Sequence, residues 1–237
     1  MIDAEKCSTG EPNYRHTVDI VVFRYCRVKR VIEVLLCESD SQQGHVNLAL
    51  PGSPIDFNHE HNTLKGVVDR LVNSDQIGFP LSHVEQLGTV GDVHRDPRCW
   101  SSSTFYLGVV GDVPELKPNQ QFLPIDLALT RSTALLFDHK ELIEKALGRL
   151  VSKSLYSSLP LLFLGDEFST PVVIEVHTAL LGRKVLKSTI VKRLSTLLEV
   201  GFIRMSGRKS DQYSTNSAST FVVQRSGAIF YFDRRLS

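Results

Sequence analysis

Residues 50–78 read LPGSPIDFNHEHNTLKGVVDRLVNSDQIG, and the architecture of the chain follows from how this segment folds. It predicts the end of a strand, a tight turn at Pro51-Gly52, a polar loop and then a helix. Thr63 is a suitable N-cap, because its hydroxyl can accept a hydrogen bond from a free amide of the first helical turn. One apolar face follows at helical spacing and is predicted to be buried: Leu64, Val67, Val68 and Leu71.

This segment resembles the box of Nudix pyrophosphohydrolases, which opens with Leu-Pro-Gly and closes with a helix carrying Arg-Glu-x-x-Glu-Glu. In such a box, clustered glutamates hold divalent metal and polarise a diphosphate for attack by water. Arg70 stands at the position of the box arginine, but Asp75 is the one carboxylate among the next five residues, LVNSD. Ser53 replaces the second box glycine. Because one carboxylate makes a poor Mg²⁺ site, we expect a Nudix-shaped domain with no catalytic residues and no metal.

Length and charge distribution favour two units within the 237 residues. Residues 1–159 carry 16 Lys and Arg against 20 Asp and Glu, whereas residues 160–237 carry 11 against 6. A basic C-terminal part favours a polyanionic partner. No apolar run approaches the roughly 18 residues of a membrane span and no signal peptide is apparent, so we expect a cytoplasmic protein without a membrane partner. The cysteines lack CxxC spacing and are expected as reduced thiols: Cys7, Cys26, Cys37 and Cys99.

The N-terminal part predicts a mixed sheet with helices on both sides. A basic turn joins the first two strands as a hairpin, and the strand-like runs are 17–25, 31–37, 45–50, 83–89 and 103–110. Residues 91–100, GDVHRDPRCW, and 111–121 are expected to be loops. Asp138 is predicted to cap a helix with an apolar stripe: Leu142, Ile143, Ala146, Leu147, Leu150 and Val151. We expect residues 1–155 to form an α/β/α sandwich of the Nudix type.

Residues 156–237 predict a winged helix-turn-helix. Thr170-Pro171 combines a capping hydroxyl with proline at the first helical position, and Gly182 would end this helix. Ser188 is predicted to cap a second helix that ends at Gly201. Hairpin-like polar sequence follows over 202–232, as a wing requires. The expected fold class of the whole chain is therefore α+β.

The second helix carries the candidate DNA contacts. Thr189, Lys192, Arg193 and Thr196 are spaced i, i+3, i+4 and i+7 and are predicted to share the face opposite the leucines. Cations flanked by hydroxyls suit phosphates and base edges in a major groove, and a helix start suits a phosphate. The full predicted set is Lys187, Ser188, Thr189, Lys192, Arg193, Thr196, Arg208 and Lys209. The alternatives are a solvated basic face and a protein-binding winged helix.

Two polar loops are candidate ligand sites. In HRDPRCW, residues 94–100, Arg95 and Arg98 bracket an Asp-Pro turn, and arginine forks can bind phosphate bidentately. The alternative is a turn with two solvated arginines. His59 and His61 flank Glu60, but no third metal ligand is near in sequence, so a solvated loop is the preferred interpretation. The helical histidines are expected at hydrogen-bonded surface or interface positions: His139 and His177.

Several pieces together resemble the Nudix-related transcriptional regulators of the NrtR type: TVDIVVF (17–23), LPG (50–52), VEQLGTVGDVHRDPR (84–98), FDH (137–139) and FSTP…LLGRKVLKSTIVKRL (168–194). Such regulators join a Nudix-like domain to a C-terminal winged helix and control NAD-biosynthesis or sugar-use operons. The resemblance implies a homodimer on a palindromic double-stranded DNA operator. It also implies a small-molecule effector in the Nudix-like pocket, either ADP-ribose or a related nucleotide or phosphorylated sugar. The implied effector contacts are Arg95, Arg98 and Arg70, and the implied recognition helix begins at Ser188.

The predicted function is a ligand-responsive regulator, most simply a repressor, with a catalytically inactive Nudix-like domain and no cofactor. The effector would shift a population of domain arrangements and so change the spacing of two recognition helices on DNA. The alternative is an active Mg-dependent ADP-ribose pyrophosphatase, with metal held by Asp75, Glu60 and a distant acidic residue.

Overall fold

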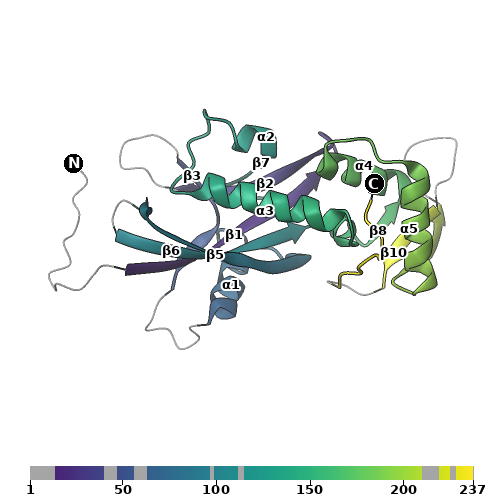
Figure 1. Ribbon diagram of the computed structural model, residues 1–237, viewed down its shortest axis with the longest axis horizontal. Helices are drawn as coiled ribbons and strands as arrows, with labels where there is room; N and C mark the ends of the chain where they lie inside the picture. Colours follow the sequence, from purple (N-terminus) through teal and green to yellow (C-terminus); the bar gives the residue numbers. More distant parts are fainter. Residues whose placement is uncertain are drawn as a thin grey trace.

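The structure, a computed structural model, describes residues 14–39, 47–55, 63–96, 99–111, 115–209, 219–224 and 228–236. A seven-stranded mixed sheet with helices on both sides forms one end of the molecule, and a three-stranded sheet with two helices forms the other (Figure 1). The predicted α+β class, a Nudix-like sandwich followed by a winged helix-turn-helix, is confirmed. His59, Glu60, His61, Arg98 and Cys7 lie outside the described residues.

β1 (Tyr14–Cys26) is the central strand of the large sheet. It forms an antiparallel hairpin with β2 (Val31–Ser39) and runs parallel to β6 (Cys99–Val110) over most of its length. The sheet order is β3-β2-β1-β6-β5, with β4 also paired to β1 and β7 to β2. The remaining strands are β3 (Asn47–Ala49), β4 (Gly52–Pro54), β5 (His83–Asp96) and β7 (Gln120–Pro124).

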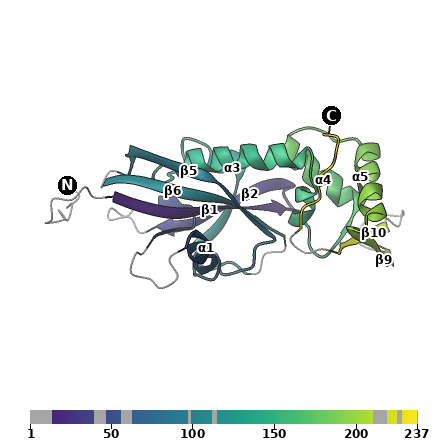
Figure 2. The same cartoon turned by 60° about the horizontal axis from the view of Figure 1, so that its bottom comes forward.

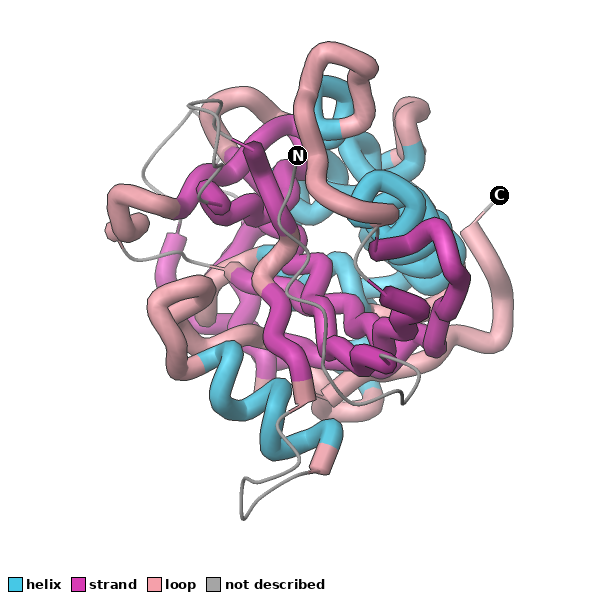
Figure 3. Tube along the Cα trace, turned by 90° about the vertical axis from the view of Figure 1, so that its left-hand side faces the viewer, coloured by secondary structure: helices cyan, strands magenta, loops and turns pink. Residues whose placement is uncertain are grey.

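Both faces of β1 are buried, which explains its nearly continuous apolar sequence. Val18, Ile20 and Val22 pack toward α1 (Leu64–Val72), and alternate residues such as Val21 and Phe23 pack toward α3 (His139–Ser154). Figures 2 and 3 show α1 on one side of the sheet and α3 on the other. Thr63 caps α1 as predicted, because its hydroxyl accepts a 3.0 Å hydrogen bond from the Gly66 N–H.

The end of β5 differs from the predicted loop. Residues 91–96 continue the strand, and Asp96 pairs with Cys99 of β6. The segment looks like a loop because its sequence is mostly polar, and residues 91–94 are exposed. Gly91, Asp92 and Asp96 nevertheless pair with β6, which is itself paired with β1.

The C-terminal unit contains the two helices and the wing. A short 3₁₀ helix, η1 (Leu159–Phe163), precedes the two helices and the wing. The remaining short helix, α2 (Ile125–Ala128), belongs to the N-terminal unit. The elements are β8 (Glu167–Ser169), α4 (Thr170–Leu181), α5 (Lys187–Glu199), β9 (Ile203–Lys209) and β10 (Ser219–Val223), with sheet order β8-β10-β9. Gly182 (φ 62°) and Gly201 (φ 68°) end the helices as predicted. The N-caps are Ser169 and Leu186, so Thr170 and Ser188 already lie inside the helices.

One apolar core runs through both units. It includes Val21 and Phe23 of the large sheet, and Val173 and Leu197 of the winged helix. Residues 228–236 return to the junction, where Phe232 N–H donates to Tyr156 O at 2.7 Å. In the described part of the chain, no helix is both long enough and apolar enough to cross a membrane.

Candidate functional site

A cleft of about 480 Å³ opens beside the first half of β1. The C-terminal end of β1, Phe23–Cys26, pairs with β2. Nearer its N-terminal end, at Thr17–Asp19, β1 pairs with β4 instead. β3 takes the vacated edge of β2 at Cys37–Ser39. This divergence of β1 from β2 forms the cleft, and residues 136–139 at the start of α3 form a further wall.

The Leu-Pro-Gly turn builds one wall. Leu50 N–H donates to His139 Nδ1 at 3.0 Å, and Pro51 O accepts from Ile20 N–H at 2.9 Å. Gly52 exchanges two hydrogen bonds with the side-chain amide of Gln76, at 2.7 and 3.0 Å. A Cβ on Gly52 would lie 2.1 Å from Asp19 Oδ1, so the turn requires glycine for space.

Asp19 and Arg95 form a buried ion pair at the back of the cleft, with only 4% and 8% of their surfaces exposed. Arg95 Nη2 lies 3.2 Å from Asp19 Oδ2, and Arg95 Nε donates to Asp138 Oδ2 at 2.7 Å. Asp19 also accepts from the Thr17 and Ser103 hydroxyls. Arg95 therefore lines the cleft, but two carboxylates already neutralise its guanidinium. Asp138 makes no side-chain cap on α3, because its carboxylate binds Arg95 instead.

His139 and His177 are core residues, which corrects the expectation of surface or interface positions. Because His139 Nδ1 accepts from Leu50, its proton is on Nε2, 3.9 Å from Asp19 Oδ1. Burial lowers the pKa of His139, so the ring is neutral near pH 7. His177 Nδ1 lies 2.8 Å from Val173 O, and burial lowers the pKa of His177 to about 4.

The other predicted ligand residues are placed elsewhere. Arg70 lies on α1 and is not among the residues that line the cleft. Asp75 follows α1, with 89% of its side chain exposed, and pairs with Lys117, which lowers the Asp75 pKa. Among the described residues, no group of three His, Cys, Asp or Glu side chains is arranged to hold a metal ion.

Sequence reasoning missed Arg15 and Gln76. Arg15 is exposed, lines the cleft and forms no ion pair with a described residue. The sequence pattern that could have identified Arg15 is the alternation of side chains along a strand. This alternation places Arg15, Thr17 and Asp19 on one face of an otherwise apolar strand. Gln76 had no comparable signal, because its role depends on how the segment after α1 folds back onto Gly52.

The outward face of α5 is rotated from the predicted one. Lys187, Ser188 and Lys192 are exposed, together with Val191, which is 42% exposed. Thr189 and Thr196 are half-buried at the edge of this face. Arg208 and Lys209 lie on β9, the wing strand that pairs with β10.

Arg193 is buried, with 8% of its surface exposed, so the prediction that it contacts DNA is corrected. Its guanidinium donates to the carbonyl oxygens of Ser154 and Leu155 at the end of α3, and to Arg234 O. It also lies 4.3 Å from the ring centre of Phe232. Burial lowers the pKa of Arg193 to about 10. The arginine therefore ties α5 to α3 and to the C-terminal segment.

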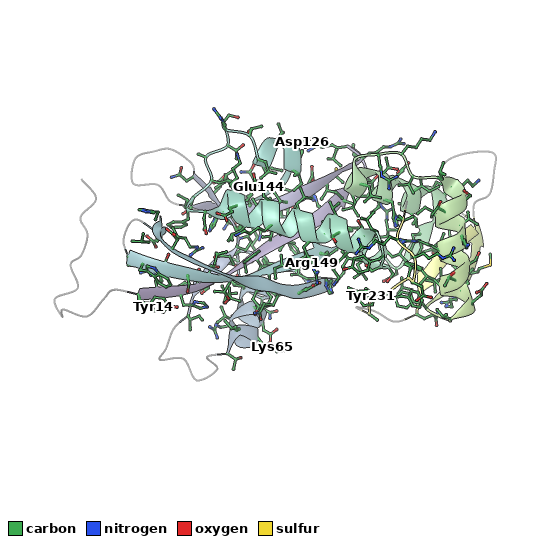
Figure 4. The ribbon with its side chains drawn as sticks, viewed as in Figure 1. Tyr14, Lys65, Asp126, Glu144, Arg149 and Tyr231 are labelled. Atoms are coloured by element: carbon green, nitrogen blue, oxygen red, sulfur yellow. The ribbon has the colours of Figure 1, made fainter. Side chains whose placement is uncertain are left out.

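A second cluster fixes the same end of α3 to the large sheet. Glu85 of β5 accepts from Arg149 at 2.8 Å and from Lys153. Burial alone would raise the Glu85 pKa, but hydrogen bonds from Lys153, Arg149 and His83 outweigh it and lower the pKa to about 2. Figure 4 shows Arg149 on α3 and Tyr231 beside it at the junction of the two units.

Comparison with known proteins places these features in context. No protein-family model matches the chain. The ADPR responsive transcriptional repressor NtrR of Acinetobacter baylyi is 24% identical over 188 residues, covering 77% of this chain and 73% of that protein. The crystal structure of Shewanella oneidensis NrtR has a TM-score of 0.78 and 27% identity. The same protein complexed with a 27mer DNA has a TM-score of 0.79 and 28% identity.

Both Shewanella matches cover 93% of this chain and 99% of that chain, so the likeness includes the cleft and the winged helix. A MutT/nudix family protein of Enterococcus faecalis, at 21% identity and a TM-score of 0.68, shares the fold. The sequence motifs, the cleft beside the Leu-Pro-Gly turn and these comparisons agree. In sequence motifs, fold and domain order, the chain is similar to the Nudix-related transcriptional regulators of the NrtR type.

Proposed function

We propose that this protein is a DNA-binding repressor whose Nudix-like cleft binds ADP-ribose or a closely related nucleotide, and that ligand binding changes its affinity for DNA. The Acinetobacter relative is named as ADPR responsive, and the Shewanella protein was crystallised with a 27mer DNA. One observation carries the proposal most directly. α3 begins at the cleft with His139 and ends where its last carbonyl groups bind Arg193 of α5.

α3 would act as the mechanical connection between the two sites. Its 16 residues span about 24 Å at 1.5 Å per residue. A ligand that moves the Leu50–His139 contact would move the start of α3. Because Ser154 at its other end is bound to α5, that shift would change the position of the recognition helix. We place the boundary between the units after residue 155, directly beyond α3.

The DNA surface of the proposal is the outward face of α5 with the adjacent wing. Lys187, Ser188 and Lys192 supply positive charge and a hydroxyl on one exposed face. Helix-turn-helix proteins commonly bind two half-sites as symmetric dimers, one helical turn apart or a multiple of it. We therefore propose a homodimer on a palindromic operator, with Arg208 and Lys209 of the wing strand contacting the phosphate backbone.

We also infer that the cleft binds its ligand without hydrolysing it. Asp75 pairs with Lys117 beyond the end of α1, and Asp69 on α1 pairs with Lys65 on an exposed face. Neither residue lines the cleft. The Acinetobacter relative, which covers 77% of this chain, is named as a transcriptional repressor, and this supports a role outside catalysis. Magnesium-dependent release of AMP from ADP-ribose by the purified protein would contradict this inference.

The test is fluorescence-anisotropy binding to a DNA duplex that the protein itself selects from a random-sequence pool. We expect tight binding that resists competitor DNA and changes with ADP-ribose. Lys192→Ala should bind all sequences more weakly and show a smaller salt dependence, because one phosphate contact contributes about 0.9 to the log–log salt slope. Failure to enrich any sequence would refute the DNA-binding role. Binding indifferent to every adenine nucleotide tested would refute the effector assignment alone.

A further inference from the structure

Phe137 has a backbone conformation that its residue type disfavours. Its φ is 53°, in the left-handed region, where a bulky side chain is strained and where glycine or asparagine is common. The side chain lines the cleft and 45% of its surface is exposed. Apolar burial therefore does not account for a phenylalanine at this position. Such strain concentrates at ligand-binding positions.

The neighbouring residues hold Phe137 in this conformation. On one side, Leu136 N–H donates to Leu48 O of β3 at 2.9 Å. On the other side, Arg95 binds the Asp138 carboxylate, and Leu50 binds the His139 ring. The Phe137 and His139 ring centres lie 5.5 Å apart in an edge-to-face arrangement. With both flanking residues fixed, the ring is pre-positioned at the cleft wall.

The cleft therefore offers two different kinds of contact. Phe137 offers an aromatic surface, on which a base can stack whatever its hydrogen-bonding pattern. Arg15 offers an exposed guanidinium, whose planar fork matches phosphate oxygens. Arg95, the arginine predicted for that role, already has two carboxylate partners. A ligand with a base at one end and phosphates next to it would use both contacts.

We propose that Phe137 is the stacking platform for the adenine base of the effector, and that Arg15 binds its phosphates. This assignment rests on the proposed function and specifies how the nucleotide lies in the cleft. It makes Phe137 a specificity-determining residue, because it separates ligands with a base from phosphorylated sugars without one.

The experiment is isothermal titration calorimetry on the full chain, with ADP-ribose and ribose 5-phosphate as ligands. Phe137→Asn removes the ring while suiting the left-handed backbone, and Phe137→Tyr keeps the ring. We expect Phe137→Asn to bind ADP-ribose about 10- to 100-fold more weakly, which is the range for losing one stacked base. Phe137→Tyr should stay within about threefold of wild type. Wild type, Phe137→Asn and Phe137→Tyr should bind ribose 5-phosphate with equal affinity. Arg15→Gln should bind both ADP-ribose and ribose 5-phosphate more weakly.

The outcomes separate this inference from the proposed function. If wild type binds ADP-ribose and Phe137→Asn binds it equally well, the stacking role is wrong and the effector assignment stands. An equal loss for both ligands in Phe137→Asn would also overturn stacking, because the base would then not be what the ring recognises. If wild type binds AMP or NAD but not ADP-ribose, and Phe137→Asn loses that binding, stacking stands and only the ADP-ribose assignment falls. No binding of any adenine nucleotide overturns both. Thermal unfolding verifies that Phe137→Asn is folded, with a Tm equal to or above wild type.

Discussion

Replacing Arg193 distinguishes a structural role for this residue from the DNA contact that its sequence position suggests. Arg193→Met keeps most of the aliphatic length and removes the guanidinium. Three backbone carbonyl groups then lose a donor, on Ser154, Leu155 and Arg234, and Phe232 loses its cation contact. At about 1 kcal/mol for each hydrogen bond and about 0.5–2 kcal/mol for the cation–π contact, the loss is about 3–5 kcal/mol.

An opposing effect reduces this loss. Burial lowers the Arg193 pKa from 12.5 to about 10, which means that the folded state disfavours the charge by about 3 kcal/mol. Methionine removes that penalty. The net destabilisation expected for Arg193→Met is therefore about 0–2 kcal/mol, or a fall in Tm of at most about 8 °C. Arg193→Ala also loses the packing of the aliphatic chain and should fall further.

The matched control is Lys192→Met on the exposed side of the same helix. It should leave Tm within about 1–2 °C of wild type, since exposed substitutions change stability by about 0.5 kcal/mol or less. Its DNA salt slope should fall by about 0.9, whereas that of Arg193→Met should not change. The measurements are thermal unfolding by circular dichroism and anisotropy titrations at several salt concentrations. A wild-type Tm with a reduced salt slope in Arg193→Met would refute the buried position of this arginine.

Three further changes test other contacts. Gly52→Ala should lower the free energy of unfolding in urea by about 1–3 kcal/mol, because the added Cβ meets Asp19. The control Gly148→Ala has open space around its Cβ and should raise it by up to about 1 kcal/mol. An equal effect of both substitutions would contradict the steric argument. Burial lowers the pKa of His177 from 6.5 to about 4, so the neutral ring's contribution to stability is complete above pH 6.5 and is lost as pH falls. Urea unfolding should show a loss of about 2 kcal/mol by pH 5 in wild type and none of this loss in His177→Leu. An identical pH dependence in the two proteins would contradict this assignment. Glu85→Gln should lower the free energy of unfolding, measured thermally, by about 2–4 kcal/mol, because buried Lys153 is left without a carboxylate. The control Glu141→Gln, whose partner Lys145 is exposed, should lower it by less than about 1 kcal/mol. Similar losses in the two variants would contradict a special role for Glu85.

The elements that local sequence determines were predictable. The Thr63 cap and the apolar spacing after it gave α1, and Gly182 and Gly201 gave the ends of the two winged-helix helices. The β1–β2 hairpin followed from two apolar runs around a basic turn. Residues 91–96 were predicted wrongly because their polar composition conceals pairing with β6, and pairing partners are a tertiary property.

The functional residues depended more on tertiary contacts. Arg193 lies about 60° around the helix from Ile190, at the edge of the apolar arc, where the sequence allows either exposure or burial. It is buried because the end of α3 and the C-terminal segment pack there, and neither is near in sequence. Arg95 lines the cleft, but its pairing with Asp19 and Asp138 could not be predicted, because it depends on the folded arrangement of three separate segments.

The junction between the two units has a consequence for how sequences of this kind can diverge. Arg193 binds main-chain oxygens at positions 154, 155 and 234, and every amino acid supplies such an oxygen. Substitutions at those three positions can therefore accumulate without loss of the contact, whereas position 193 needs a long side chain with several donors and position 232 an aromatic ring. The two units can thus drift apart in sequence at their common boundary while one arginine preserves the geometry between them.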